Sequence, residues 1–522
     1  MHHENTPTHT GTGTGEGADY IVVGTGPGGS PVIRRLIDAG HRVTVLEAGP
    51  TDARPGIEDP RAAFSLFGTE IDWGLLTEPQ EHLGGRALYL PRGRVLGGTS
   101  AINGMAYVRG AAADFDAWEA TGAAGWAWRD VEPYFRRLED FGPGPGAGRG
   151  TGGPLPVRRN DDPDPVAAAF VAAAEGAGYP RNDDYNDDGG PLGASLVQAT
   201  LVDGGRVTAW RAYVAPVLGS PLLTVVTEAH VTRVLVEDGR AVGVEYRGPD
   251  GEARTVRARR EVVLAAGVFG TPQILLLSGV GPAGHLHEHG ITRVVDLPGV
   301  GENLRDHAVV PVVWERAGAA PGVPGMGVQA QLVREGTENS MIRPDRQGIV
   351  IPYVYSTVRE GLPDSGFTTV AVVLHPYSTG TVRLRSADPA DPPRIDPATL
   401  SDPRDVEALI EEVAVLRELV RRPELAAHVA AEVHPGEADL RAYVHAAADA
   451  GHHQVGTARM GTDALAVVDP RLRVRGVAGL RVADASVMPF TPAGNTAGPT
   501  FMIGERAADL LLEDLAAAPD RP

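Results

Sequence analysis

The sequence predicts an α/β protein in which a Rossmann-type part is interleaved with an α+β part built on an antiparallel sheet. Residues 19–49 read strand, glycine turn, helix, strand, which is how a parallel sheet covered by helices begins. Alternating apolar and polar residues from 222 to 266, broken by Asp-Gly turns, predict an antiparallel meander. We expect further strands at 349–356, 368–374 and 381–384. A chain of 522 residues is long enough for two such parts.

The opening segment predicts a bound dinucleotide. Gly24, Gly26 and Gly29 form G-x-G-x-x-G between a buried apolar strand, residues 20–23, and a helix. Glycine permits the tight turn there, the close approach of backbone to a pyrophosphate and the packing of helix on strand. The unpaired N–H groups at the helix N-terminus favour that anion. Glu47 ends the second strand, where it can accept hydrogen bonds from a ribose diol and would repel a 2′-phosphate. The motif therefore indicates NAD or FAD rather than NADP.

The remaining segments are consistent with a loop-rich two-part protein. Residues 114–141 are predicted to be largely helical, and their aromatic side chains are interpreted as core packing. The Gly/Pro-rich residues 142–154 indicate a surface loop. Residues 404–420 form an amphipathic helix that follows Ser401-Asp402-Pro403. Residues 1–17 are rich in Gly, Thr and His, have no apolar signal core, and are predicted to be a disordered leader.

Charge and composition exclude several classes of partner. The chain has 47 basic and 67 acidic residues and a net charge of −20, which repels nucleic acid and anionic membranes. It has no apolar run of the roughly 20 residues that cross a bilayer. The absence of cysteine excludes disulfides, thiolate metal sites and a cysteine nucleophile. We therefore expect a cytoplasmic protein that binds neither nucleic acid nor a membrane.

Two clusters could suggest a metal site, and neither is favoured. His285 and His289 fall at i, i+4 in the segment HLHEH, but a solvated helix end explains them better. Four aspartates crowd a glycine-rich loop at residues 183–188 without the closing glutamate of an EF-hand, which indicates an exposed acidic loop. We predict no metal.

Further glycine-rich segments make the prediction more specific. They are RGRVLGGTSAINGMAYVRG (92–110), GTPQILLLSGVG (270–281), LPGVGENLRDH (297–307), HQVGTARMG (453–461), GLRVADASVMP (479–489) and GNTAGPTFMIGERAAD (494–509). Together with the first motif, in this order and spacing, they resemble the glucose–methanol–choline (GMC) family of FAD-dependent oxidoreductases, and its choline dehydrogenase-like members in particular. The resemblance extends from about residue 19 to the C-terminus.

The resemblance implies a cofactor and the residues that hold it. FAD would lie extended through the Rossmann-type part, and Ile102, where some members carry a histidine that attaches the flavin, implies that FAD is non-covalent. The implied FAD-binding residues are Gly24, Gly26, Gly29, Glu47, Val95, Gly98, Thr99, Asn103, Gly104, Val231, Asp484, Ala485 and Thr496.

The resemblance also implies two catalytic residues, His453 and Asn495. Family members oxidise an alcohol by hydride transfer to flavin N5 while a histidine at the His453 position takes the hydroxyl proton. An imidazole with an ordinary pKa near ~6.5 suits that transfer, and Asn495 would orient the substrate oxygen. His452 and Gln454 stand where the family more often has Tyr and Pro, so the substrate pocket is expected to differ.

The function expected is therefore FAD-dependent oxidation of a small-molecule alcohol, with the substrate, the electron acceptor and the oligomeric state left open. One alternative is a hydroxynitrile-lyase-type reaction on the same scaffold without net redox change, and another is an inactive FAD-binding protein. The FAD-binding domain is expected to be discontinuous. It comprises residues 18–157, 222–308 and 446–522, and the substrate domain comprises residues 158–221 and 309–445.

Overall fold

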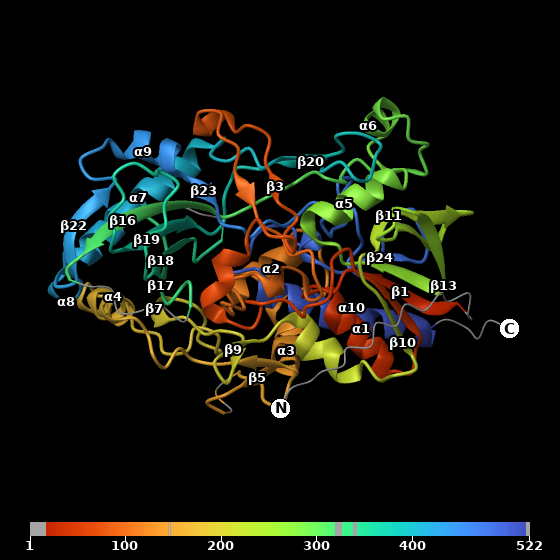
Figure 1. Ribbon diagram of the computed structural model, residues 1–522, viewed down its shortest axis with the longest axis horizontal. Coiled ribbons are helices and arrows are strands. Elements are labelled where there is room, and N and C mark those ends of the chain that lie inside the picture. The colour runs from red at the N-terminus through yellow and green to blue at the C-terminus, as the bar shows by residue number, and fades with distance from the viewer. Residues whose placement is uncertain (1–16, 145, 147, 319–325, 338–341, 518–522) are drawn as a thin grey trace.

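The computed structural model describes residues 17–144, 146, 148–318, 326–337 and 342–517, so the predicted leader lies outside the described residues except for Gly17. Two seven-stranded sheets dominate the described chain, one at each side of the view in Figure 1. This is the mixed α/β architecture that the sequence predicts.

The first sheet is mainly parallel and carries an antiparallel extension. Its strands, in order across the sheet, are β10 (Leu223–Val226), β2 (Val43–Leu46), β1 (Ala18–Val23), β13 (Ala253–Leu264), β12 (Arg240–Arg247) and β11 (His230–Glu237), with β24 (Leu480–Val482) also paired to β13. The twelve-residue β13 joins the two parts: its first half pairs antiparallel with β12, and its second half pairs parallel with β1 and β24.

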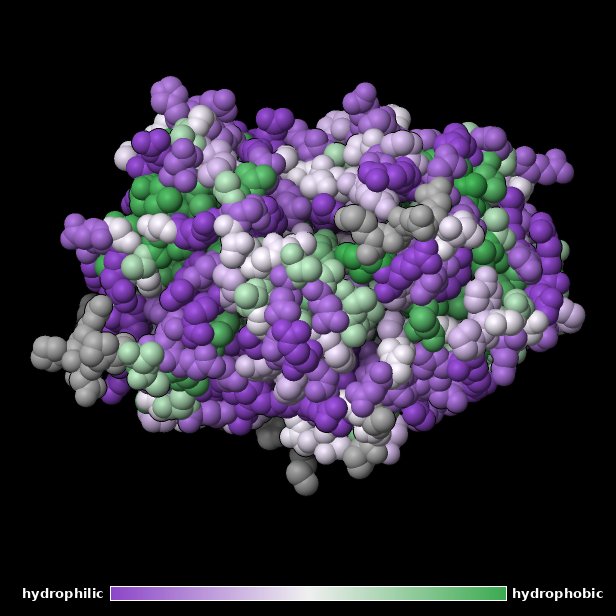
Figure 2. Space-filling model, turned by 180° about the vertical axis from the view of Figure 1, so that it is seen from behind, coloured by the Kyte–Doolittle hydropathy of each residue, from purple (hydrophilic) through white to green (hydrophobic). Residues whose placement is uncertain are grey.

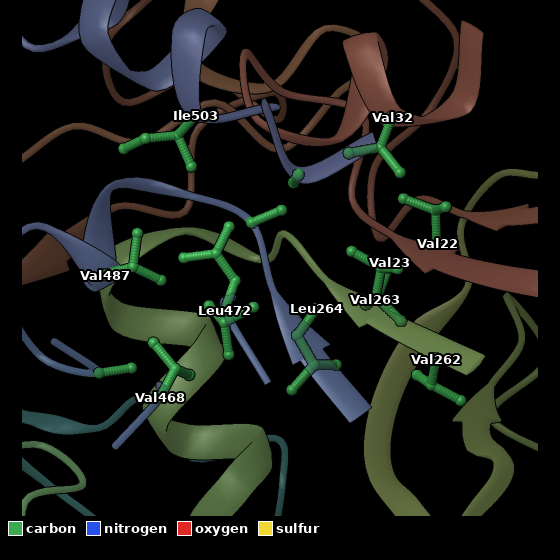
Figure 3. Packing of buried hydrophobic residues seen from close by; sticks show 14 of the residues in the cluster. Val22, Val23, Val32, Val262, Val263, Leu264, Val468, Leu472, Val487 and Ile503 are labelled. Carbon is green, nitrogen blue, oxygen red and sulfur yellow. The ribbon is translucent and has the colours of Figure 1, made fainter. Parts of the chain in front are cut away.

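The parallel part forms because its strands and covering helices are apolar where they meet. Helix α1 (Gly29–Asp38) buries Val32, Ile33, Leu36 and Ile37, the face predicted by its periodicity. Figure 3 shows Val32 of α1 beside Val22 and Val23 of β1, with Leu264 of β13 and Ile503 of α10 (Ala497–Ala517) in the same cluster. This packing fixes the turn between β1 and α1.

The predicted meander over residues 222–266 is wrong for its first strand. β10 pairs parallel with β2 instead of antiparallel with β11. Glu228 has a φ of 53° in the short connection between the strands, so the chain turns there and β11 begins outside the parallel part. β11, β12 and the first half of β13 form the predicted antiparallel arrangement.

The second sheet is antiparallel throughout. Its strands, in order, are β22 (Val429–His434), β16 (Ala308–Arg316), β19 (Gly366–Val373), β18 (Arg346–Ile351), β17 (Ala330–Arg334) and β7 (Gly193–Leu196), with β23 (Asp449–Ala450) also paired to β16. One face packs on α4 (Pro165–Gly176) and α7 (Pro403–Val420), as Figure 1 shows on the left. Among the described residues, the apolar side chains of the other face cluster with loop residues and with none inside an α-helix, so we call it the helix-free face; several of its residues line the cavity described below.

Shorter elements connect the two sheets. The helices are α2 (Ala112–Ala120), α3 (Trp128–Leu138), α5 (Gly267–Leu277), α6 (Ala283–Glu288), α8 (Pro423–Ala426) and α9 (Leu440–Ala447). The two-stranded pairs are β3 (Leu75–Leu76) with β4 (Tyr89–Leu90), β5 (Glu139–Phe141) with β6 (Leu155–Val157), β8 (Leu201–Val202) with β9 (Gly205–Arg206), β14 (Val280–Gly281) with β15 (Val295–Asp296), and β20 (Thr381–Arg383) with β21 (Arg394–Asp396).

The described surface is dominated by polar side chains. Figure 2 shows a face that is largely hydrophilic, with apolar atoms confined to smaller patches, as expected for a chain with a net charge of −20. Among the described helices, none has the length and apolar character needed to cross a membrane. His285, one of the histidines considered above for a metal, instead accepts a hydrogen bond at Nε2 from the Leu384 backbone N–H (3.0 Å).

Candidate active site

A cavity of about 830 Å³ lies between the two sheets and is lined by residues from both. We call the part of its wall formed by residues 24–28, 92–104 and the start of α5 the glycine half. The part formed by the helix-free face of the second sheet is the sheet half. His453 and Asn495 also lie on this wall. The cavity thus brings together segments that span most of the described chain.

The glycines of the first motif serve different purposes. Gly24 has a φ of 96°, and a Cβ on it would lie 2.4 Å from the carbonyl oxygen of Ala265. A Cβ on Gly28 would lie 1.9 Å from the carbonyl oxygen of Ala483, so this position lets the loop pack on the C-terminal segment. Gly26 is different, because the nearest atom to its Cβ would be Gly98 Cα at 4.0 Å. A side chain at Gly26 would enter the cavity.

Glu47 lies on the cavity wall and also holds the glycine loop. Its Oε2 accepts hydrogen bonds from the Thr25 backbone N–H (3.1 Å) and the Thr25 hydroxyl (2.6 Å), and its Oε1 accepts one from the Gly49 N–H (3.0 Å). Burial raises the pKa of this carboxyl, and these hydrogen bonds lower it in part. The carboxylate is thereby fixed at the end of β2, facing the cavity.

Most of the predicted FAD-binding residues lie on the wall. These are Gly24, Gly26, Glu47, Gly98, Thr99, Asn103, Gly104, Val231, Asp484, Ala485 and Thr496. Two do not line the cavity. Gly29 lies one residue beyond the loop, where a Cβ would meet the Gly24 carbonyl oxygen at 2.1 Å, and the Val95 side chain is buried in a separate apolar cluster. Both positions support the wall from behind.

The glycine half fits a dinucleotide of the FAD kind. Gly104, like Gly26, has a Cβ position that faces open space: apart from its two chain neighbours, no described residue has an atom within 4 Å of it. Backbone is therefore exposed to a ligand at two places, and the N-terminus of α1 follows directly after Gly28. We call the part of the cavity at His453 and Asn495 the reaction end. There His452 lines the cavity, and its Nδ1 has no hydrogen-bond partner among the described residues. A buried polar atom without a partner is a position where a ligand is expected to bind.

Strand pairing explains how His453 reaches the cavity. β23 pairs with the first residues of β16, so the segment after β23 runs beside His307, the residue just before β16. The Gly451 N–H donates to the His307 carbonyl oxygen (2.8 Å). A Cβ on Gly451 would lie 2.6 Å from that oxygen, so glycine is required for this close approach. Asn495 belongs to a third segment, and it lies two residues before the start of α10.

A chain of hydrogen bonds fixes the proton positions on both imidazoles. His307 Nε2 lies 3.1 Å from the carbonyl oxygen of Pro492, which only accepts, so this nitrogen carries the proton. His307 Nδ1 is then an acceptor, and it lies 2.9 Å from His453 Nδ1, which must donate. His453 Nε2 is left without a proton and accepts from the Asn495 amide nitrogen at 2.8 Å. The bonds at Pro492 and at Asn495, the two ends of this hydrogen-bond chain, are both consistent with an unprotonated Nε2 on His453.

The electrostatics keep His453 neutral. Burial, followed by the neighbouring His452 and Arg92, lowers the pKa of His453 to about 3. The pKa of His307 is lowered well below its ordinary value, first by burial and then by His453 and His375. An imidazole that is neutral throughout the physiological range is able to accept a proton.

Three functional residues lie in the quoted motifs but were not singled out from the sequence. They are Arg92, Asp306 and His307. Asp306 Oδ1 accepts from the His453 backbone N–H (2.8 Å), and its Oδ2 accepts from Gln454 Nε2 (2.5 Å). The pKa of Asp306 is raised to about 7. Burial raises it, and the His453 hydrogen bond and Arg92 oppose part of that rise. The signal that could have found Asp306 and His307 is a pair of polar residues just before the buried apolar strand β16, whereas Arg92 follows β4 and has no such signal.

The Gln454 contact gives a reason for one departure from the family pattern. A proline at this position would have no side-chain donor for Asp306, whereas Gln454 supplies one. The backbone here is also unusual, because His452 has a φ of 62°. The segment is therefore held in place by Asp306 and by Arg92, whose guanidinium donates to the His452 carbonyl oxygen (3.2 Å).

Comparisons with known proteins identify the family to which the chain is similar. Family models described as GMC oxidoreductase match residues 18–309 and 376–504. The chain is 41% identical to an uncharacterized GMC-type oxidoreductase of Mycobacterium tuberculosis, over 95% of this chain and 99% of that protein. It is 38% identical to an oxygen-dependent choline dehydrogenase of Brucella ovis, over 95% of each.

A solved structure shows the same fold. Pyridoxine 4-oxidase from Mesorbium loti superposes with a TM-score of 0.91 at 31% identity, covering 96% of this chain and 100% of that one. Two family models that span most of the chain, and a relative 41% identical along nearly all of it, confirm the resemblance: this chain belongs to the GMC family of FAD-dependent oxidoreductases.

Proposed function

We propose that this protein oxidises an alcohol with FAD as its cofactor, and that His453 Nε2 is the base that takes the hydroxyl proton. The observation that carries the proposal is the hydrogen-bond chain from Pro492 through His307 to His453, which leaves an unprotonated nitrogen on the cavity wall. Relatives named choline dehydrogenase and pyridoxine 4-oxidase support an alcohol as the substrate.

FAD would be held by the glycine half. Residues 24–28 and the N-terminus of α1 suit the pyrophosphate, and Glu47 suits a ribose. Val231 and residues 98–104 also line the cavity and would contact other parts of FAD. When bound, FAD supplies the acceptor for the hydride that leaves the alcohol carbon. Ile102 lines the cavity, and an isoleucine has no atom that could bond to the flavin, so we propose non-covalent attachment. Acid precipitation is expected to leave the yellow colour in the supernatant; colour retained in the pellet would contradict this.

The side chains of this site would act on the hydroxyl in a defined order. The substrate hydroxyl would replace the Asn495 amide on His453 Nε2, and the displaced amide N–H could donate to the substrate oxygen. As the proton arrives at Nε2, His453 becomes an imidazolium that still donates from Nδ1 to His307. Asp306, on the His453 backbone N–H, would stabilise that charge when it is ionised.

We also propose the division into an FAD-binding domain and a substrate domain at the boundaries predicted from the sequence. The two sheets support it, because the first sheet carries the glycine half and the second carries the sheet half. A cytoplasmic location stays part of the proposal, supported by the absence of cysteine.

The test is anaerobic absorption spectroscopy of the purified protein with a panel of alcohols, sugars, sterols and choline. Bleaching of the oxidised flavin band by one class is the expected result. Release of cyanide from a hydroxynitrile without bleaching would support the lyase alternative, which the names of the relatives do not favour. A protein with no flavin band after addition of FAD would contradict the proposal.

A further inference from the structure

The sheet half of the cavity is apolar except for two glutamines. Gln331 of β17 and Gln347 of β18 lie on the same face of the sheet as the aliphatic residues of this wall. These aliphatic residues are Val309, Val328, Ile349, Ile351, Val370 and Val372. Strand alternation places those within strands on the helix-free face, because they alternate with residues of the apolar cluster that contains α4 and α7, and Val328 lies just before β17. An alcohol bound against this face would contact hydrocarbon and two amides.

No carboxylate of the described residues lines the sheet half. The acidic residues on the cavity wall are Glu47, Asp391 and Asp484. The Glu47 carboxylate accepts from Thr25 in the glycine loop, and the Asp484 carboxylate accepts from Thr271 of α5. Asp391 is joined to α5 through its backbone carbonyl oxygen, which accepts from Gln273, and its carboxylate accepts from Ser386. All three therefore belong to the opposite half.

Two carboxylates near this wall, Asp306 and Asp449, accept hydrogen bonds from neighbouring residues. Asp306 accepts from His453 and Gln454, and Asp449 accepts from the Tyr355 hydroxyl (2.9 Å) and the Ala450 N–H (2.9 Å). Neither lines the cavity, as far as the described residues define it.

The charged side chain that lines the cavity beside His452 is a cation. Arg92 is half-buried, lines the cavity and is the last of the three causes that lower the pKa of His453. Aromatic rings at the edge, such as Phe64 and Phe67, would attract a cation. They provide no counter-charge, and an ammonium ion buried without a carboxylate loses its hydration uncompensated. The cavity is therefore unfavourable to a quaternary ammonium substrate.

The two glutamines form a polar row that ends at the cavity. Gln331 Nε2 donates to the Ser195 hydroxyl (3.2 Å), and Gln347 Nε2 donates to Gln331 Oε1 (2.8 Å). Gln331 and Gln347 are 1% and 4% exposed, so little solvent competes for the hydrogen bonds of the row. Gln347 Oε1 receives no hydrogen bond from the described residues. It is an acceptor available to a ligand in an otherwise aliphatic wall.

We propose, on the basis of the proposed function, that the substrate is an uncharged alcohol with an apolar body and a second hydroxyl or similar donor that binds Gln347 Oε1. The alcohol group meets His453, the body lies on the valines and isoleucines, and the second group meets the amide row. Gln347 is thus a specificity-determining residue, and the substrate differs in charge from that of the relatives named choline dehydrogenase.

The first experiment compares choline with 3,3-dimethylbutan-1-ol, which has the same shape without the charge. Binding is measured by perturbation of the flavin absorption spectrum of the holoenzyme, and turnover by anaerobic bleaching. We expect the neutral compound to bind at least tenfold more tightly. Equal or tighter binding of choline would overturn the proposal, as would no binding by any neutral alcohol. Selective binding without bleaching by any alcohol would support the substrate class and contradict the proposed function, so the two failures are distinguishable.

The second experiment tests Gln347 with α,ω-diols of four to eight carbons and the matching 1-alkanols. In the wild type we expect the best diol to exceed its alkanol at least tenfold in kcat/KM, or in affinity if turnover is absent. Gln347→Leu should abolish that ratio, and Gln347→Glu should improve choline binding at least tenfold. Gln329→Leu removes a buried glutamine that does not line the cavity and should preserve the ratio. A diol-to-alkanol ratio near one in the wild type would overturn the role of Gln347.

Discussion

The two halves of the cavity are built in different ways. The glycine half is mostly backbone. It combines three separate segments, and each segment takes its shape from its own glycine turn or strand–helix unit. The sheet half and the reaction end instead consist of single side chains from distant segments: His307 lies 146 residues from His453, and Asn495 lies 42 residues from it. The cofactor wall is thus recognisable from local motifs that the fold brings together, whereas chemistry and substrate choice depend on the packing of the two sheets.

The difference predicts how each half responds to mutation. In the glycine half an added methyl group either collides with backbone or enters the ligand space, as Gly28 and Gly26 show. In the reaction end the loss of one side chain removes a hydrogen bond and leaves the fold in place, because the segment is also held through its backbone. Mutations should therefore separate cofactor binding from catalysis.

The largest effect on catalysis is expected from His453→Ala. Removal of a general base reduces rates by about 10²–10⁴-fold, so flavin reduction by the best alcohol should fall within that range while the flavin spectrum is unchanged. Stopped-flow absorbance under anaerobic conditions measures the rate. The exposed His287→Ala serves as the matched control and should reduce at the wild-type rate. Reduction of the His453→Ala protein at that same rate would exclude it as the base.

Gly26→Ala and Gly28→Ala should separate ligand space from packing space. A Cβ on Gly26 has no protein atom closer than 4.0 Å, so the apoprotein should keep its melting temperature. FAD affinity should fall by about 5- to 150-fold if the methyl group costs the 1–3 kcal/mol typical of overpacking. Gly28→Ala places its Cβ 1.9 Å from the Ala483 carbonyl oxygen and should lower the melting temperature of the apoprotein itself. Calorimetry with and without FAD measures both; equal apoprotein stability of the two variants would refute the distinction.

His307 should act by positioning His453. His307→Leu leaves His453 Nδ1 without its acceptor, so the imidazole is no longer restricted to one tautomer or orientation, and kcat should fall by about 10- to 100-fold. His307→Gln restores an acceptor and should recover part of the loss. Nitrogen NMR of ¹⁵N-histidine-labelled protein should show His453 protonated at Nδ1 in the wild type and a mixture in His307→Leu. Protonation of wild-type His453 at Nε2 would disprove this role.

These differences explain what could be predicted from sequence. The loop at Gly24, the end of β2 at Glu47 and helix α7 follow from local patterns: glycine spacing, apolar runs and the Asp402 cap, whose side chain accepts from the Arg404 N–H. The parallel pairing of β10 was missed, because a four-residue apolar strand carries no sign of its partner.

The reaction end was predicted in part. Family motifs pointed to His453 and Asn495, but His307 became visible only through the pairing of β16 with β23. The same limit applies to Gln331 and Gln347, which are neighbours across two strands and are unremarkable in sequence. A motif can also point to a residue whose side chain lies elsewhere. Val95 was predicted to line the cofactor site from its motif, and its side chain lies in a separate apolar cluster. Contacts between distant segments are set by the packing of the whole sheet, which a local pattern does not contain.

The smallest effect expected concerns pH. Because burial, His452 and Arg92 lower the pKa of His453 to about 3, the base is already neutral well below the ordinary histidine value, and no loss of activity near pH 6.5 should come from it. Asp306, with a pKa raised to about 7, titrates in that range instead. As the pH falls through 7 it gains a proton and loses the charge that would stabilise the imidazolium, so kcat/KM should decline only a few-fold.

Asp306→Asn separates the two groups. It should remove the step near pH 7 and give a flat profile of kcat/KM between pH 5 and 8, measured by anaerobic flavin reduction at each pH. A step near pH 6.5 that persists in Asp306→Asn would mean that His453 titrates like an exposed histidine. In that case the burial that lowers the pKa of His453 would not persist in the working enzyme.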